Sequence, residues 1–181
     1  MAALGGSIAR RYAKAIFEIG AELGTFEIFG RELNALATLW KSSAELRQTL
    51  ENPVFKLSQK RDVLQSMMPR LAPARQVQSL ALLLLERGRI AALPAVARAY
   101  EEMCDEKLGR VRALVKSAKP LDIASEAEIR KALERRTGKR VLMTTVVDPG
   151  LIAGVVARVA GMELDGSVAS RLSAIKHRLL N

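Results

Sequence analysis

The chain has 181 residues, of which 49% are hydrophobic, 27% are charged and 4% are aromatic. This composition is typical of a globular protein with a core of aliphatic side chains, and it excludes an intrinsically disordered chain. The net charge of +10 favours an acidic partner, but it does not choose among protein, nucleic acid and lipid surface.

Apolar runs and cysteine content limit the class of protein further. The longest apolar run in the first half, residues 80–85, is far shorter than the ~20 residues needed to cross a bilayer. A single cysteine, Cys104, excludes an internal disulfide and a multi-cysteine metal site, so we expect a buried helix residue there. The first seventeen residues are basic, as in an organelle transit peptide, but an apolar helical stripe continues through them. We therefore expect this segment to be part of the folded protein, and we expect a bacterial cytoplasmic protein.

Residues 1–108 show helical periodicity throughout, because apolar residues recur at spacings of three and four. We expect Ser58 to cap the fourth helix, Pro69 to end it, and the leucine-rich fifth helix to lie at the centre of the fold. The pattern predicts six helices in an antiparallel bundle, at residues 7–23, 26–40, around 46–50, 58–68, 73–86 and 94–108.

Residues 109–181 follow a different pattern, in which β-branched runs alternate with helical signals. We expect Ser125 and Glu128 to form a capping box, Gly150 to adopt positive φ after Asp148 and Pro149, and Ser167 to cap a last helix. The strands are expected at residues 111–118, 140–147, 155–159 and 162–165. The predicted fold is α+β but mainly α, with a six-helix bundle at 1–108 and a small α+β domain at 109–181.

The sequence offers few residues that could support catalysis. The only histidine, His177, lies between two basic residues near the end, with no nucleophile or orienting acid beside it. The glycines of residues 150–154 lack the Lys-Ser/Thr of a phosphate-binding loop, and no metal-ligand spacing is present. We therefore expect no enzyme activity and no cofactor.

Two binding hypotheses stay open on residue patterns alone. Residues 109–181 hold 14 of the 29 basic residues but only 7 of the 19 acidic ones, and a basic helix around residues 130–140 could follow phosphates. That part contains no aromatic residue for base stacking, which argues against nucleic acid. Near the start, small residues at Ala9, Ala13 and Ala15 would let another helix approach closely, although core packing explains them equally well.

Short motifs occur in a fixed order along nearly the whole chain. They comprise Ala9, Tyr12, Ala13, Ala15, Ile16 and Phe17; Asn52, Pro53 and Lys60; Gly88, Arg89, Leu93 and Pro94; Gly109; residues 117–121 and 137–139; and the glycine-rich stretch 146–172. Together they resemble the delta subunit of F-type ATP synthases, whose mitochondrial counterpart is the oligomycin-sensitivity-conferral protein. Two positions depart from the usual pattern, Arg11 and Ala153, the second standing where many members have glycine.

The resemblance implies a non-catalytic stator subunit, peripheral on the cytoplasmic face of a bacterial inner membrane and not inserted in it. The N-terminal part would bind the N-terminal helix of an alpha subunit on the alpha/beta catalytic head, and the C-terminal part would bind the peripheral-stalk b subunits. The residues implied for the alpha-subunit groove are Arg11, Tyr12, Ala13, Ala15, Ile16, Leu80, Leu84 and Arg89. Those implied for the stalk are Gly154, Arg158, Asp165, Gly166, Ser167 and Arg171. The alternative is a basic nucleic-acid-binding protein.

Overall fold

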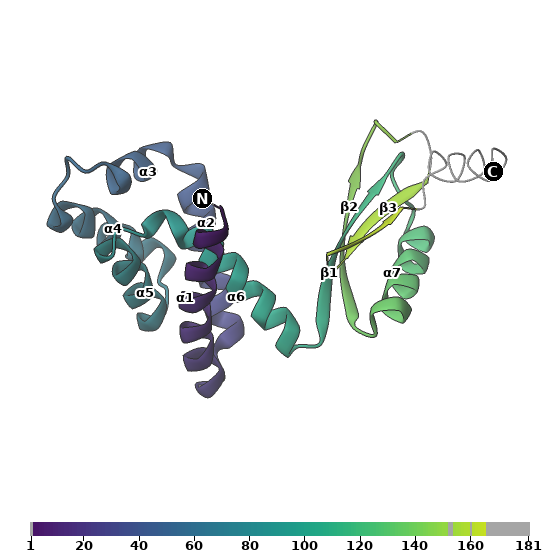
Figure 1. Cartoon of the computed structure of the whole chain (residues 1–181), viewed down its shortest axis with the longest axis horizontal. Coiled ribbons are helices and arrows are strands. Elements are labelled where there is room, and N and C mark those ends of the chain that lie inside the picture. The colour runs from purple at the N-terminus through teal and green to yellow at the C-terminus, as the bar shows by residue number, and fades with distance from the viewer. Residues whose placement is uncertain (1, 152–153, 160, 166–181) are drawn as a thin grey trace. The chain divides into compact units, whose positions relative to one another are not determined.

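The structure is a computed structural model that describes residues 2–151, 154–159 and 161–165. Contacts along the chain divide it into two compact units, Met1–Cys104 and Asp105–Asn181 (Figure 1). The division into a domain at 1–108 and a domain at 109–181 stays a prediction.

The described secondary-structure elements of the first unit are all helices, and they enclose an aliphatic core. Leu33, Val77, Leu84, Val96 and Tyr100 are its largest fully buried side chains. They come from α2, α5 and α6, so these helices share one core. The helices are α1 (Ala2–Glu22), α2 (Phe26–Ser42), α3 (Ala44–Glu51), α4 (Leu57–Leu71), α5 (Arg75–Glu86) and α6 (Leu93–Lys107), with a 3-10 helix at Ile90–Ala92.

The start of α4 differs from the prediction, because Ser58 is not its N-cap. The helix begins one residue earlier, at Leu57, and the Lys56 amide N–H donates to Gln59 Oε1 at 2.9 Å. A side chain three residues into the helix thus satisfies a free backbone donor at the helix start. The prediction chose Ser58 because serine is a common N-cap residue, and it did not consider the side chain of Gln59.

Proline does not end α4 either. Pro69 lies inside the helix, two residues before its last residue, Leu71. In the last turn the missing proline N–H leaves a single carbonyl without its helical donor, so the helix tolerates it. Ala72 closes the helix in the left-handed region, with φ of 41°, and its amide donates to Met68 O at 2.8 Å. The structure also starts α1 at Ala2, five residues before the predicted start.

The described strands of the second unit form one four-stranded sheet. Its strands are β1 (Arg110–Ser117), β2 (Arg140–Val147), β3 (Val155–Val159) and β4 (Met162–Asp165), in the order β2-β1-β3-β4. Strands β1 and β2 are parallel, so they need a crossover, which α7 (Ile123–Thr137) supplies. The other pairs are antiparallel, and a turn at Gly161, with φ of 77°, joins β3 to β4.

Alternation along the strands separates the two faces of the sheet. Ala113, Val115 and Ser117 of β1 are buried, whereas Leu114 and Lys116 between them are exposed. Leu133 of α7 belongs to the same buried cluster as Ala113 and Val115, so α7 covers that face (Figure 1).

One helix start and one turn in this unit differ from the prediction. The N-cap of α7 is Asp122, whose Oδ1 accepts from the Ser125 amide at 2.7 Å, so Ser125 lies inside the helix. Hydrogen bonding from Ser125, first from its side chain and then from its backbone amide, lowers the pKa of Asp122 because it favours the charged carboxylate. The turn after β2 does form, but Gly150 lacks positive φ and donates instead to Asp148 Oδ1 at 3.0 Å. Ser167 lies outside the described residues.

Replacing Gly20 with alanine is expected to destabilise the first unit by ~1–3 kcal/mol, because a Cβ would overpack a closed contact. That atom would lie 2.9 Å from Tyr100 Oη and 3.0 Å from Phe26 Cα. Gly6 on the same helix provides a control, since its Cβ would meet no atom within 4 Å. Gly6→Ala should stabilise the helix by roughly 0.5–1 kcal/mol. Urea denaturation of both variants tests this, and shifts of the same sign would contradict the packing at Gly20.

Candidate partner-binding groove

Helices α1 and α5 border an apolar groove of about 370 Å³ on the first unit. Its lining residues are Tyr12, Ala15, Ile16, Ile19, Arg75, Gln76, Ser79, Leu80 and Leu83. On α1 the spacings of three and four residues place the lining side chains along one side of the helix.

Large apolar side chains remain exposed to solvent in this groove. Ile19 is 43% exposed and Leu83 is 38% exposed. Helix α5 is therefore not covered on all sides, which corrects the expectation that its leucine-rich sequence places it at the centre. An apolar groove between two helices is the geometry that proteins use to bind an amphipathic helix.

Four of the eight residues assigned to the groove from sequence do line it: Tyr12, Ala15, Ile16 and Leu80. Two others, Ala13 and Leu84, have an exposed fraction of 0% and belong to the core, which corrects their assignment to the groove. Consecutive helix residues point about 100° apart, so Ala13 faces the opposite side from Ala15.

The remaining two residues of that set are basic. Arg11 is exposed but does not line the groove. Arg89 lies beyond the end of α5, and its Nη1 donates to the Tyr12 hydroxyl at 3.1 Å. This hydrogen bond connects Arg89, three residues after the end of α5, to a side chain of α1 that lines the groove.

Sequence reasoning missed Ile19 and Leu83. Ile19 lies four residues after Ala15, so helical spacing could have added it, whereas the run of leucines in α5 carries no signal that singles out Leu83. None of the nine lining residues is acidic, whereas Arg75 is basic. The groove therefore favours a helix that carries acidic residues beside its apolar stripe.

The residues assigned to the stalk are only partly described. Gly154 is exposed with φ of 95°, and Asp165 is the last residue of β4. Arg158 is exposed on β3, and its Nη2 donates to Glu163 Oε2 at 2.6 Å. The others, Gly166, Ser167 and Arg171, lie outside the described residues.

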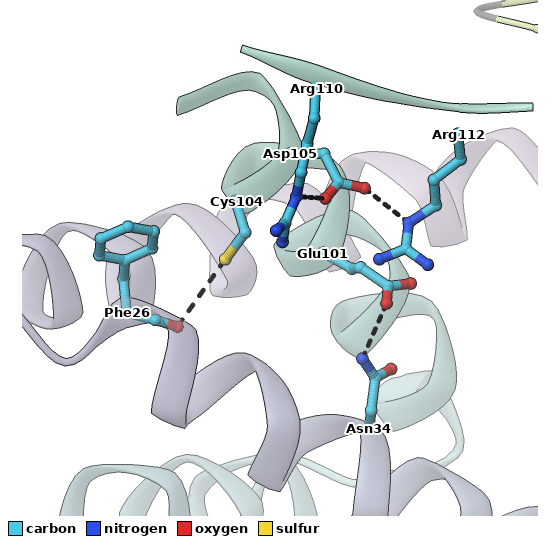
Figure 2. A network of polar contacts seen from close by, with 7 residues as sticks. All are labelled: Phe26, Asn34, Glu101, Cys104, Asp105, Arg110 and Arg112. Carbon is cyan, nitrogen blue, oxygen red and sulfur yellow. Dashed lines mark hydrogen bonds and ion pairs between the residues drawn. The ribbon is translucent and has the colours of Figure 1, made fainter. Parts of the chain in front are cut away.

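A polar network surrounds the end of α6 (Figure 2). Asp105 is 6% exposed and accepts hydrogen bonds from Arg110 Nε and Arg112 Nε, each at 2.6 Å. One turn earlier, Glu101 Oε1 accepts from Asn34 Nδ2 at 3.1 Å. Both carboxylates are held by partners within the chain, so the network is structural.

Cys104 lies beside this network and is buried, as expected from the sequence. Its Sγ lies 3.7 Å from Phe26 O, a weak contact that fits a small packed side chain. Within the ranges that the structure describes, no three His, Cys, Asp or Glu residues are grouped to hold a metal ion. None of the described helices combines the length and apolar character that crossing a bilayer requires.

Comparisons with known proteins agree in pointing to one family. The family model described as ATP synthase delta (OSCP) subunit matches residues 8–179. The ATP synthase subunit delta of Geobacter sp. strain M21 is 39% identical over 170 residues, which cover 94% of each chain. That of Anaeromyxobacter dehalogenans strain 2CP-1 is 38% identical over 174 residues, covering 96% of this chain and 97% of the relative.

A solved structure extends the likeness from sequence to fold. A chain in the cryo-EM structure of the Toxoplasma gondii mitochondrial ATP synthase hexamer matches with a TM-score of 0.74 and 27% identity. The match covers 96% of this chain and 97% of that one. The helical unit with its groove and the α+β unit thus define an ATP synthase component. This chain belongs to the ATP synthase delta (OSCP) subunit family.

Proposed function

We propose that this chain is a non-catalytic stator subunit of an F-type ATP synthase, which links the alpha/beta catalytic head to the peripheral-stalk b subunits. The observation that carries the proposal is the apolar groove between α1 and α5, in a chain of the delta family. A stator contact must hold two bodies together under torque, and it needs no reacting group.

The groove is proposed to bind the N-terminal helix of an alpha subunit. Ile19, Leu80 and Leu83 supply its apolar surface, and burying one such side chain fully contributes roughly 1.5–3 kcal/mol. Tyr12 borders the same surface with a hydroxyl that already accepts from Arg89. The six-helix N-terminal part would then act as an antiparallel bundle that presents α1 and α5 to the head.

The second unit is proposed to bind the b subunits, so that the chain as a whole couples proton flow to ATP synthesis. Its basic excess would speed association with acidic stalk segments. The chain would then be held peripherally at the cytoplasmic face of the membrane through the assembled synthase, without inserting into the bilayer.

The nucleic-acid alternative rests on the basic residues of α7 and β2. Arg130, Lys131, Arg135, Arg136, Lys139 and Arg140 are all exposed. A solvated helix face would look the same, and single-strand binding would also need aromatic side chains that this part lacks.

Affinity purification from native membranes separates the two functions. An affinity-tagged full chain is expected to recover alpha, beta and b subunits of the synthase. A gel shift with single-stranded oligonucleotides at physiological salt should show no discrete complex. Recovery of nucleic acid without any synthase subunit would overturn the proposal.

A further inference from the structure

Strand β2 lies at one edge of the sheet, because β1 is its single neighbour among the described strands. Between its first residue, Arg140, and the residue that follows the strand, Asp148, the sequence is Val-Leu-Met-Thr-Thr-Val-Val. No charged residue, proline or glycine interrupts this stretch. Edge strands that remain unpaired are usually short, or they carry charges or proline that keep a second strand away. The edge formed by β2 has none of these features.

The opposite edge of the sheet is protected in the usual way. There β4 has four residues, of which Glu163 and Asp165 are acidic. The two edges are separated by β1 and β3, so β2 is the strand farthest from β4. The contrast between the two edges indicates that β2 is suited to pairing with a further strand.

Two backbone hydrogen bonds show which residues of β2 face β1. The Arg140 amide donates to Gly109 O at 3.1 Å, and the Asp148 amide, just after the strand, donates to Ser117 O at 2.9 Å. Successive residues of a strand turn their backbone groups to opposite sides. The even-numbered residues of β2 therefore bond to β1, and the odd-numbered residues turn their N–H and C=O groups outwards.

The outward groups of β2 are mostly unpaired. The Val141 amide donates to Glu134 Oε1 of α7 at 3.1 Å, which confirms the outward direction of the odd-numbered residues. For the amides of Met143, Thr145 and Val147, the described part of the chain supplies no hydrogen-bond partner. The edge thus presents a row of backbone donors and acceptors to a second strand.

A second copy of β2 matches this row when it runs antiparallel, with Thr144 of the two copies directly opposite each other. In this register outward residues meet outward residues, because Met143 lies opposite Thr145 and Val141 lies opposite Val147 of the other copy. Each such pair exchanges two backbone hydrogen bonds. The Val141 amide then exchanges a side-chain acceptor for a backbone carbonyl.

The same register brings opposite charges together at both ends of the paired strands. Arg140 lies opposite Asp148 of the second copy, and the symmetry repeats this contact. Within one chain Arg140 lies opposite Arg110 of β1, a like-charge arrangement that costs stability. The Asp148 carboxylate is 33% exposed and holds Lys116 at 2.9 Å. A carboxylate can accept several hydrogen bonds, so Asp148 can also accept from Arg140.

We propose that two copies of the free chain associate by antiparallel pairing of their β2 strands, which joins the two sheets into one. The inference does not rest on the stator function, since it concerns the chain outside a complex. An extended segment of another protein would use the same backbone groups, but the second copy supplies the matching charge at both ends. One strand from each copy buries little area, so we expect a reversible dimer with a dissociation constant in the micromolar range or weaker.

Disulfide trapping tests the register. Thr144 lies on the symmetry axis in a pair without mutual hydrogen bonds, where the Cα atoms are about 4.5 Å apart and a disulfide can form. The full chain with Thr144→Cys should therefore give a covalent dimer in oxidised glutathione. Val146→Cys is the control, because it lies on the same face of β2 but the two introduced thiols would be roughly 13 Å apart along the strand. The native Cys104 is buried. Equal trapping of the two variants, or no trapping of Thr144→Cys, would overturn the proposal.

Sedimentation equilibrium of the full chain tests the charges. Arg140→Glu should weaken the dimer at least ~10-fold, because glutamate would lie opposite Asp148 at both ends. The variant should remain folded, since the change also removes the like-charge pair with Arg110. Arg98→Glu makes the same change of charge on α6, at a side chain that is 83% exposed, and should leave the dissociation constant within about twofold of the wild type.

Three results of this experiment would overturn the proposal. The first is a wild-type chain that remains monomeric up to millimolar concentration. The second is a dimer that Arg140→Glu and Arg98→Glu weaken equally. The third is a dimer that Ile19→Asp abolishes while Arg140→Glu retains it, which would place the contact in the groove between α1 and α5.

Discussion

Replacing Ala15 with leucine is expected to weaken binding of the alpha-subunit N-terminal helix at least ~10-fold, because the added side chain occupies the centre of an interface. Ala15 is exposed and lines the groove between α1 and α5, so the leucine would fill space that the incoming helix needs. The free energy of unfolding should change by no more than about 0.5 kcal/mol, as for other surface substitutions. Titration with an alpha-subunit peptide and urea denaturation measure the two effects.

Ala13 is the matched control for this experiment. It lies two residues away on the same helix, but its exposed fraction is 0%. Ala13→Leu should therefore cost ~1–3 kcal/mol of stability through overpacking, and its folded fraction should still bind the peptide. If Ala15→Leu binds normally, or loses binding only in proportion to lost folding, the groove is not the docking site.

Replacing Tyr100 with alanine is expected to destabilise the first unit by ~3–5 kcal/mol, the range found when a large buried aromatic is removed. The side chain is fully buried, its hydroxyl donates to Phe26 O at 2.9 Å, and its ring meets that of Phe17 edge-on at 5.6 Å between centroids. Tyr100→Phe should cost only ~0.5–1.5 kcal/mol, because it removes the hydrogen bond alone. Chemical denaturation measures the free energy of unfolding of both variants. If both lose the same amount, packing of the Tyr100 ring does not contribute to the stability of the first unit.

The Tyr100 hydroxyl also makes stability depend on alkaline pH. Burial raises the pKa of Tyr100 above its ordinary value of 10.0, because the charged phenolate is poorly solvated there. The unfolded chain then releases this proton at a lower pH than the folded chain does. The stability due to this group is full below pH 10.0 and decreases as pH rises above it. Tyr100→Phe should lose less stability on the same alkaline titration.

Periodicity predicted most elements of the fold. Strands β2, β3 and β4 lie where the sequence placed them, because each pattern is set by residues close in sequence. Helix starts were less predictable, since Ser58 and Ser125 each gave a plausible cap and the structure used Gln59 and Asp122 near those starts. Several polar side chains within a few residues can satisfy the same free backbone donors, so a local motif does not single out one of them.

The groove could be predicted only in part, because its residues come from two helices far apart in sequence. Helical spacing on α1 links Tyr12, Ala15 and Ile19. It does not show whether α5 presents Leu83 or Leu84 to solvent, since the run of leucines has no polar face to orient it. Packing against the other helices buries Leu84 and leaves Leu83 exposed.

Bridging of the catalytic head to the stalk tests the central claim most directly. Alpha/beta head complexes that lack a delta subunit are mixed with the soluble part of the b subunits, with and without this chain, and sedimented. The b subunits are expected to sediment with the head only when the chain is present. If the b subunits sediment equally well without the chain, or if the chain binds the head and leaves them in solution, the chain does not link head to stalk.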